Sequence, residues 1–134
     1  MGTTNFDAVT VTDGFTGNLT GDVTGAVTAT TVSASTSLAV GASGTAITQI
    51  RVYAPSLTPA EVAANTTAEQ TFTVTGLTTA DKVFVNKPTA QAGLGIVGQR
   101  VSAANTLAIT FANVTGSPIT PTAAQTYAVV AIRS

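Results

Sequence analysis

The stretch Leu107-Ala108-Ile109-Thr110-Phe111 alternates large apolar residues with small or hydroxylated ones, and Thr71-Phe72-Thr73-Val74-Thr75 shows the same alternation earlier in the chain. A period of two places successive side chains on opposite faces of a β-strand. Each stretch is therefore typical of a strand with one buried face. The residues predicted to face the core are Phe72, Val74, Leu107, Ile109 and Phe111.

Several other runs in the second part of the chain are predicted to be strands. With the two stretches above, the predicted strands cover residues 47–53, 70–75, 82–86, 98–103, 106–112 and 126–133. Residues 127–132 are apolar at every position, which is typical of a strand covered on both faces. Short strands separated by turns that contain Gly, Asn or Pro predict an all-β chain, with a small antiparallel β-sandwich over residues 45–134.

Only residues 58–64 suggest a helix. Thr58 has the side chain of an N-cap, Pro59 stands at the first helical position, and Glu61 follows Thr58 by three residues. These signals predict a helix of about two turns.

Residues 1–44 differ from the rest of the chain, because four tandem units of the form x-Φ-Thr-Gly occupy residues 14–29. The units are Gly14-Phe15-Thr16-Gly17, Asn18-Leu19-Thr20-Gly21, Asp22-Val23-Thr24-Gly25 and Ala26-Val27-Thr28-Ala29. A period of four matches neither a strand nor a helix. It indicates short extended pieces separated by bends that glycine permits.

A single copy of this repeat is not expected to be stable. Ordering each residue costs about 1–2 kcal/mol of backbone entropy, whereas burying an apolar side chain returns only about 1.5–3 kcal/mol. Three copies wound around one axis would bury their apolar residues together and pair their backbones. The repeat therefore predicts an intertwined homotrimerisation arm over residues 1–44, with the interface residues Phe15, Leu19, Val23 and Val27. The alternative is a disordered low-complexity tail.

The composition excludes several classes of function. The 134 residues include no Cys and no His, and the net charge is −1. Thiol or imidazole catalysis, disulfide frameworks and Cys/His zinc sites are therefore excluded. The chain has no basic field for nucleic acid, and its apolar runs are too interrupted to span a membrane. We expect no catalytic residues, no cofactor, no metal, and neither nucleic acid nor membrane as a partner.

Two local patterns invite a functional interpretation that their context does not favour. Gly93-Leu94-Gly95-Ile96-Val97-Gly98 matches the dinucleotide pattern G-x-G-x-x-G, but the residues after it are predicted to be strands, and no acidic residue follows Asp81. This run is predicted to be a flexible loop between strands. Asp81-Lys82, just before a predicted strand, is interpreted as a solvated pair in a turn.

The run Gly17-Asn18-Leu19-Thr20-Gly21-Asp22-Val23-Thr24-Gly25 resembles the repeats of head-fibre and tail-fibre proteins of tailed bacteriophages. Residues 63–77, 100–107 and 111–115 are similar to a small β-sandwich domain common among phage virion proteins. The resemblance covers most of the chain, from about residue 14 to residue 133. It implies a homotrimer with an intertwined shaft, displayed on the virion.

Size then favours one role within that group. Four short repeats make a short shaft, and a domain of about 90 residues makes a modest head. These sizes fit a capsid decoration (cement) protein or short head fibre on the outer capsid surface, with the phage major capsid protein as partner. The alternative is a tail-fibre or minor tail adhesin that binds a receptor or glycan, for which Tyr53 is the candidate aromatic platform. The candidate capsid contacts are the basic residues Arg51, Lys87 and Arg100.

Overall fold

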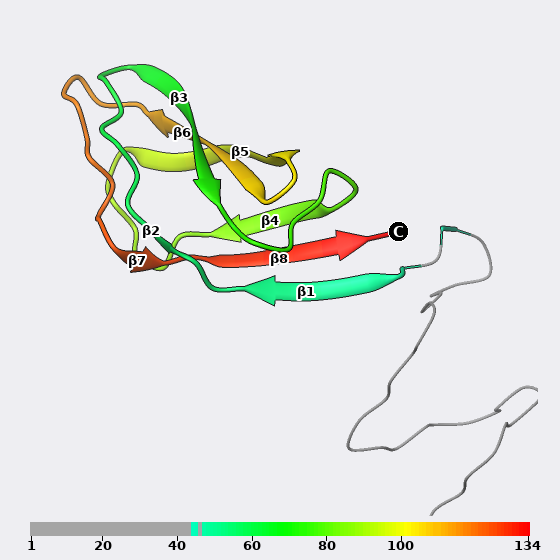
Figure 1. Ribbon diagram of the computed structural model, residues 1–134. Coiled ribbons are helices and arrows are strands. Elements are labelled where there is room, and N and C mark those ends of the chain that lie inside the picture. Colours follow the sequence, from blue (N-terminus) through cyan, green and yellow to red (C-terminus); the bar gives the residue numbers. More distant parts are fainter. Residues whose placement is uncertain (1–43, 46) are drawn as a thin grey trace, which may run out of the picture. The chain divides into compact units, whose positions relative to one another are not determined.

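The computed structural model describes residues 44, 45 and 47–134, whose path is shown in Figure 1. Within these residues the chain forms strands joined by turns and loops, with no helix. The strands are β1 (Gln49–Tyr53), β2 (Ser56–Leu57), β3 (Thr66–Thr73), β4 (Lys82–Asn86), β5 (Leu94–Ala103), β6 (Thr106–Asn113), β7 (Gln125–Thr126) and β8 (Ala128–Arg133). The predicted interface residues Phe15, Leu19, Val23 and Val27 lie outside the described residues.

All strand pairs in the described part are antiparallel. One three-stranded sheet has the order β1-β8-β4, and a second has the order β3-β6-β5. The short strands β2 and β7 form a two-stranded ribbon. The prediction of an antiparallel all-β domain is therefore confirmed, and two sheets that share one core are consistent with the predicted sandwich.

The five residues predicted to face the core all pack there. Leu107, Ile109 and Phe111 have no exposed surface, because alternate positions of β6 point to the same side of the sheet. Val74 is buried and Phe72 packs against the same cluster. Period-two alternation was thus a correct guide to the inner face of this sheet.

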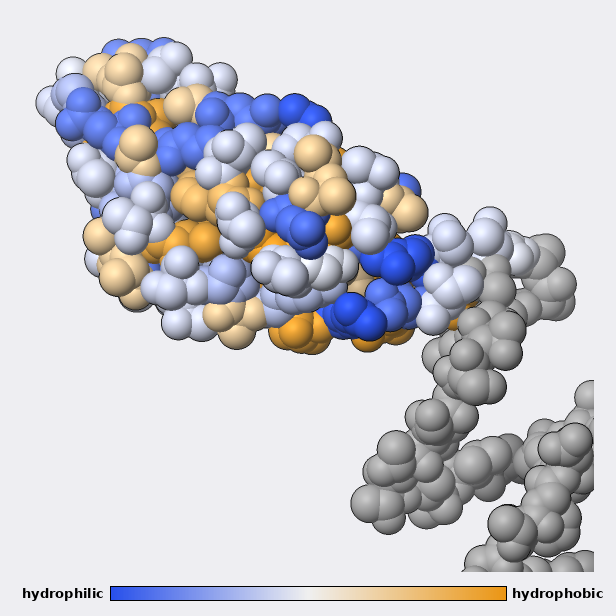
Figure 2. Space-filling model, in the orientation of Figure 1, coloured by the Kyte–Doolittle hydropathy of each residue, from blue (hydrophilic) through white to orange (hydrophobic). Residues whose placement is uncertain are grey.

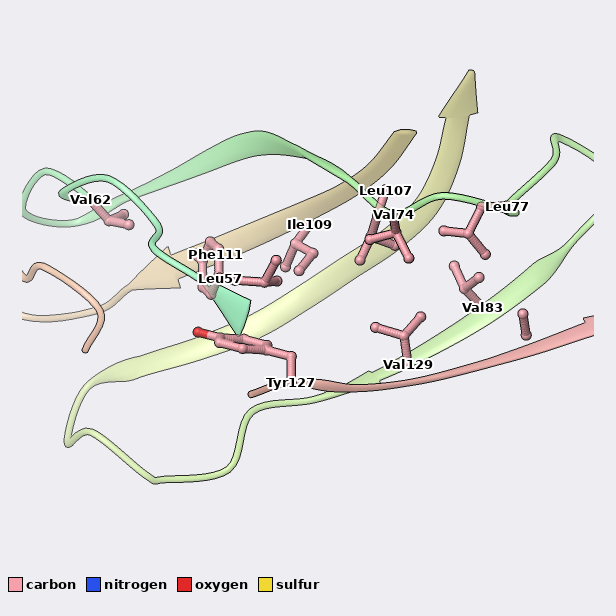
Figure 3. Close-up of a cluster of buried hydrophobic side chains, with 11 residues drawn as sticks. Leu57, Val62, Val74, Leu77, Val83, Leu107, Ile109, Phe111, Tyr127 and Val129 are labelled. Carbon is pink, nitrogen blue, oxygen red and sulfur yellow. The ribbon is translucent and has the colours of Figure 1, made fainter. Parts of the chain in front are cut away.

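The other sheet supplies the opposite wall of the core. Figure 3 shows Val83 and Val129 pointing toward Val74 and Leu107. Tyr127 is fully buried, and its hydroxyl has no hydrogen-bond partner among the described residues. Burial raises the pKa of Tyr127, because the charged phenolate is poorly solvated there.

Asn113, the last residue of β6, is a buried polar anchor. Its Nδ2 donates to the carbonyl oxygens of Val62 and Ser117 at 3.0 and 2.8 Å. Its Oδ1 accepts from the backbone N–H and the hydroxyl of Thr115 at 2.9 and 2.8 Å. Every donor and acceptor position of the amide is used, so this one side chain ties the end of β6 to two loops.

The prediction of a helix over residues 58–64 is wrong. Val62 is instead fully buried and forms an isolated bridge to Ile119, with N–H to carbonyl distances of 2.9 and 3.0 Å. The Gln70 side chain also accepts from the N–H of Ala60 at 2.7 Å and donates to its carbonyl at 2.9 Å. The backbone N–H and carbonyl groups of Ala60 and Val62 therefore find partners elsewhere in the fold, and they do not need the hydrogen bonds of a helix. A helix of only two turns is marginal by itself, so these tertiary partners decide the conformation.

The glycine-rich run at residues 93–98 is largely the start of β5 and not the predicted flexible loop. β5 begins at Leu94 and pairs with β6, with a bulge at Val97. Gly93 has a φ of 76°, and a side chain there would collide with Thr115. The glycine is thus needed for a turn and a close approach of two loops.

Candidate functional site

The outward side of the β1-β8-β4 sheet carries apolar side chains in register. Directly opposed residues of an antiparallel pair share one face of the sheet. Ile50 is opposed by Ile132, and Val130 is opposed by Val52 on one side and by Phe84 on the other. We call these five residues, Ile50, Val52, Phe84, Val130 and Ile132, the apolar face.

Much of the apolar face is open to solvent in one copy of the chain. Ile50, Val52 and Phe84 are 56%, 70% and 59% exposed, and Val130 and Ile132 are half-buried. Figure 2 shows apolar surface along the lower margin of the molecule, beneath β1. Contiguous exposed apolar surface of this kind marks interaction sites of soluble proteins.

The outward side of the β3-β6-β5 sheet has the opposite character. Its paired residues are threonines, alanines and glycines together with one ion pair, and the one large apolar residue exposed on these strands is Val97, at the bulge of β5. Arg100 donates from Nε and Nη2 to the Glu69 carboxylate at 3.1 and 2.8 Å, across the small residues Ala108 and Thr110 of β6. This sheet therefore has the polar outer face that is usual for an antiparallel sheet in water, and the β1-β8-β4 sheet does not.

The run 127–132 was predicted to be covered on both faces, and the described residues of one copy cover only one of them. Tyr127 and Val129 are fully buried and Ala131 is nearly so. On the other side, Ala128 is exposed and Val130 is half-buried. The composition of β8 therefore suits two covered faces, whereas the described fold supplies cover for one.

The candidate capsid contacts do not form one basic patch. Arg100 is held by Glu69 on the polar sheet. Lys87, just after β4, donates from Nζ to the carbonyl and hydroxyl of Thr89 at 2.6 and 3.2 Å, and partial burial lowers its pKa. Arg51 lies on β1, opposite Ala131, with its side chain exposed. The three cations thus lie on separate parts of the domain, and none belongs to the apolar face.

Asp81 is not the solvated turn residue that the sequence predicted. Its side chain is only 2% exposed, and it accepts from Arg133 Nε and Nη2 at 2.7 and 2.9 Å. The N–H of Thr78 also donates to it, at 2.8 Å. The hydrogen bonds from Arg133, with the help of that from Thr78, outweigh desolvation and lower the pKa of Asp81.

We expect the Asp81–Arg133 pair to make the domain acid-sensitive. A carboxylate whose pKa is lowered by folding adds stability above its unfolded pKa of about 3.9. That contribution is lost as the pH falls through the lower pKa of the folded state. Asp81→Asn keeps an acceptor for Thr78 but removes the charge, so it should lower the free energy of unfolding by about 1–3 kcal/mol at neutral pH.

Denaturant unfolding of the wild type and Asp81→Asn between pH 7 and pH 3 checks this. The stability difference should stay constant down to about pH 5 and shrink below pH 4, where the Asp81 carboxyl of the unfolded wild type takes up a proton before that of the folded protein does. A difference that does not change over this range would show that Asp81 contributes through packing rather than through its charge.

The described residues contain no cluster of side chains typical of a metal centre. No three acidic side chains of this part of the chain lie close enough together to hold a metal ion. None of its segments is a helix able to cross a membrane. Tyr53, the candidate aromatic platform, packs against the core, and its hydroxyl is buried without a partner among residues 44, 45 and 47–134.

Sequence reasoning did not find the apolar face. The alternation in Gln49-Ile50-Arg51-Val52-Tyr53 favours Ile50 and Val52 as core residues, yet the structure turns them outward and packs Tyr53 inward. One signal was available in Val83-Phe84-Val85, where three consecutive apolar residues indicate a strand with two apolar faces.

Comparisons of this chain with protein-family models, with curated proteins and with solved structures find no match. Its function is therefore inferred from its own residues and surfaces.

Proposed function

We propose that this chain is a structural virion protein: a homotrimeric capsid decoration (cement) protein, or short head fibre, that binds the outer surface of a tailed-phage capsid and stabilises it. The observation that carries the proposal is the x-Φ-Thr-Gly repeat of residues 14–29, because its central run resembles the shaft repeats of phage fibre proteins. The small antiparallel β domain that follows the repeat supports a short shaft with a modest head.

A non-enzymatic role agrees with the chemistry of the chain. His and Cys are absent from the whole sequence. Two of the acidic side chains in the described part, Asp81 and Glu69, are already held by Arg133 and Arg100. A trimer also suits attachment to a repeating shell, because three weak contacts on one body raise avidity by about 10²–10⁴ over one contact.

The adhesin alternative receives less support. Tyr127 is fully buried and the Tyr53 hydroxyl is buried. Neither ring is therefore presented as the open aromatic platform that a glycan site would use. Phe84 is an exposed aromatic residue, but its cross-strand neighbours Val130 and Val52 are aliphatic, and it is a single ring without a second aromatic side chain beside it in that row.

Binding to undecorated capsids tests the proposed function. The purified full-length protein should bind saturably, at hundreds of copies per particle, and should raise the melting temperature of the shell, because each bound trimer adds free energy to the assembled state. Binding is measured by sedimentation with the particles, and shell melting by calorimetry. Binding to host cells without binding to capsids would place the protein among the adhesins instead.

Two arm variants provide a matched comparison for this assay. Leu19→Asp places carboxylates in the predicted apolar stack of the trimer, where unpaired charge is unfavourable, and Thr20→Asp makes the same change at a predicted outward position. Leu19→Asp should lose most of the capsid binding that depends on avidity, whereas Thr20→Asp should retain it. Equal binding by both variants would contradict the predicted arm register.

A further inference from the structure

We propose that the apolar face of the β1-β8-β4 sheet is an interface between copies of this chain, so that the β domains of a trimer pack on one another through Ile50, Val52, Phe84, Val130 and Ile132. The inference rests on the homotrimer of the proposed function and extends it from the arm to the folded domain. It supplies the second covered face that the composition of residues 127–132 calls for.

The place where the predicted arm joins the domain favours a second copy as the occupant. Residues 1–43 precede the described domain, and only residues 44–48 separate them from Gln49, the first residue of β1. Val27, the last predicted interface residue of the arm, precedes Gln49 by 22 residues, and 22 steps of a fully extended chain span at most about 75 Å. An arm that holds three chains together would therefore keep three β1 strands, each with Ile50 and Val52 on its outward side, within reach of one another.

Because the predicted arm already tethers the three β domains to one another, a weak affinity between their apolar faces is enough for them to associate. A short linker gives a local concentration on the order of millimolar. A face with an intrinsic dissociation constant of about 1 mM would then be substantially occupied, although separate domains would scarcely associate at micromolar concentration. An open row of five apolar residues is of the right kind for such a weak, tether-dependent contact.

The charges of the two outer surfaces also favour self-association through this face. The cross-strand rows that contain the apolar face include a single charged residue, Lys82 of β4, which is paired with Ile132 of β8. Copies can therefore meet without opposing a cluster of like charges. The other sheet presents Glu69, Arg100 and a row of threonines, which are well solvated and leave that side suited to water or to a polar partner.

The oligomeric state of full-length variants tests the inference. Val52→Asp places a carboxylate on the apolar face, and Thr71→Asp places one on the polar sheet. The two positions are well matched, because both side chains are β-branched, exposed and carried by edge strands. Sedimentation over a range of concentrations should show a trimer for the wild type and for Thr71→Asp. For Val52→Asp, dissociation should begin at a concentration at least about 100-fold higher, since a carboxylate buried without a partner is strongly unfavourable.

The outcomes separate this inference from the proposed function. Val52→Asp that assembles like the wild type overturns the inference, and a monomeric wild type overturns both the inference and the proposed trimer. If Val52→Asp stays trimeric but no longer binds capsids, the face docks on the capsid, so the inference fails and the decoration function stands. If Val52→Asp dissociates and the wild-type trimer binds no capsid, the inference stands and the function fails.

A labelling experiment keeps the test independent of any folding defect in Val52→Asp. The chain has no cysteine, so Val52→Cys and Thr71→Cys each provide a single thiol. In the assembled full-length protein a maleimide should modify Val52→Cys at least about tenfold more slowly than Thr71→Cys, because thiol reactivity depends on access. The two rates should converge when the protein is diluted until it dissociates. Equal rates in the assembled protein would overturn the inference.

Discussion

Asn113→Ala should lower the free energy of unfolding by about 3–5 kcal/mol, since it removes four hydrogen bonds at a buried site, each worth about 0.5–1.5 kcal/mol, and leaves the Thr115 N–H without an acceptor. The substitution leaves the carbonyls of Val62 and Ser117 and the N–H of Thr115 without the amide that now bonds to them. Denaturant unfolding measures the change. A domain of this size has a total stability of about 5–13 kcal/mol, so the variant should be close to unfolding at physiological temperature.

Asn86→Ala is the matched control for this change. Asn86 ends β4, is exposed, and its side chain makes no hydrogen bond to another described residue. Removal of its amide should change the free energy of unfolding by less than about 0.5 kcal/mol. If Asn113→Ala is as mild as Asn86→Ala, water replaces the buried amide, and Asn113 is not the anchor of the two loops.

Phe111→Ala should also be strongly destabilising, by about 3–5 kcal/mol, because it removes a large side chain from a closed core and leaves a cavity. Phe111 has no exposed surface and lies in the cluster that both three-stranded sheets build. The loss is measured by denaturant unfolding, and a midpoint shift without a change in slope would show that the folded state is otherwise intact.

Phe84→Ala makes the same chemical change on the apolar face and is the control. Phe84 is 59% exposed in one copy of the chain, so its removal should cost the isolated fold less than about 1 kcal/mol. Under conditions in which the protein assembles, Phe84→Ala should weaken association instead. Equal destabilisation of dilute protein by both variants would mean that residues outside the described part cover Phe84 within a single chain.

Much of the fold was predictable because the deciding pattern is local. β4 was predicted with its observed bounds, and β6 was predicted to within one residue at its end. The short strands β2 and β7 were not predicted, since two residues carry no periodicity. The helix over residues 58–64 was a false prediction, because capping signals are worth little against the tertiary partners that Val62 and Ala60 find.

The sequence by itself determined the longer strands β4 and β6, which side chains of β6 form the core, and that no chemistry can rely on a Cys or His of this chain. Only the tertiary structure decided which side of β1 and β4 points outward, that Asp81 is buried against Arg133, and that Asn113 anchors two loops. The physical reason is that the first set of features depends on residues close together in the sequence, whereas the second depends on residues far apart in it. Alternation acts between neighbouring residues, whereas the orientation of a sheet face and the partner of a buried polar group depend on segments that are remote in sequence and meet only in the fold.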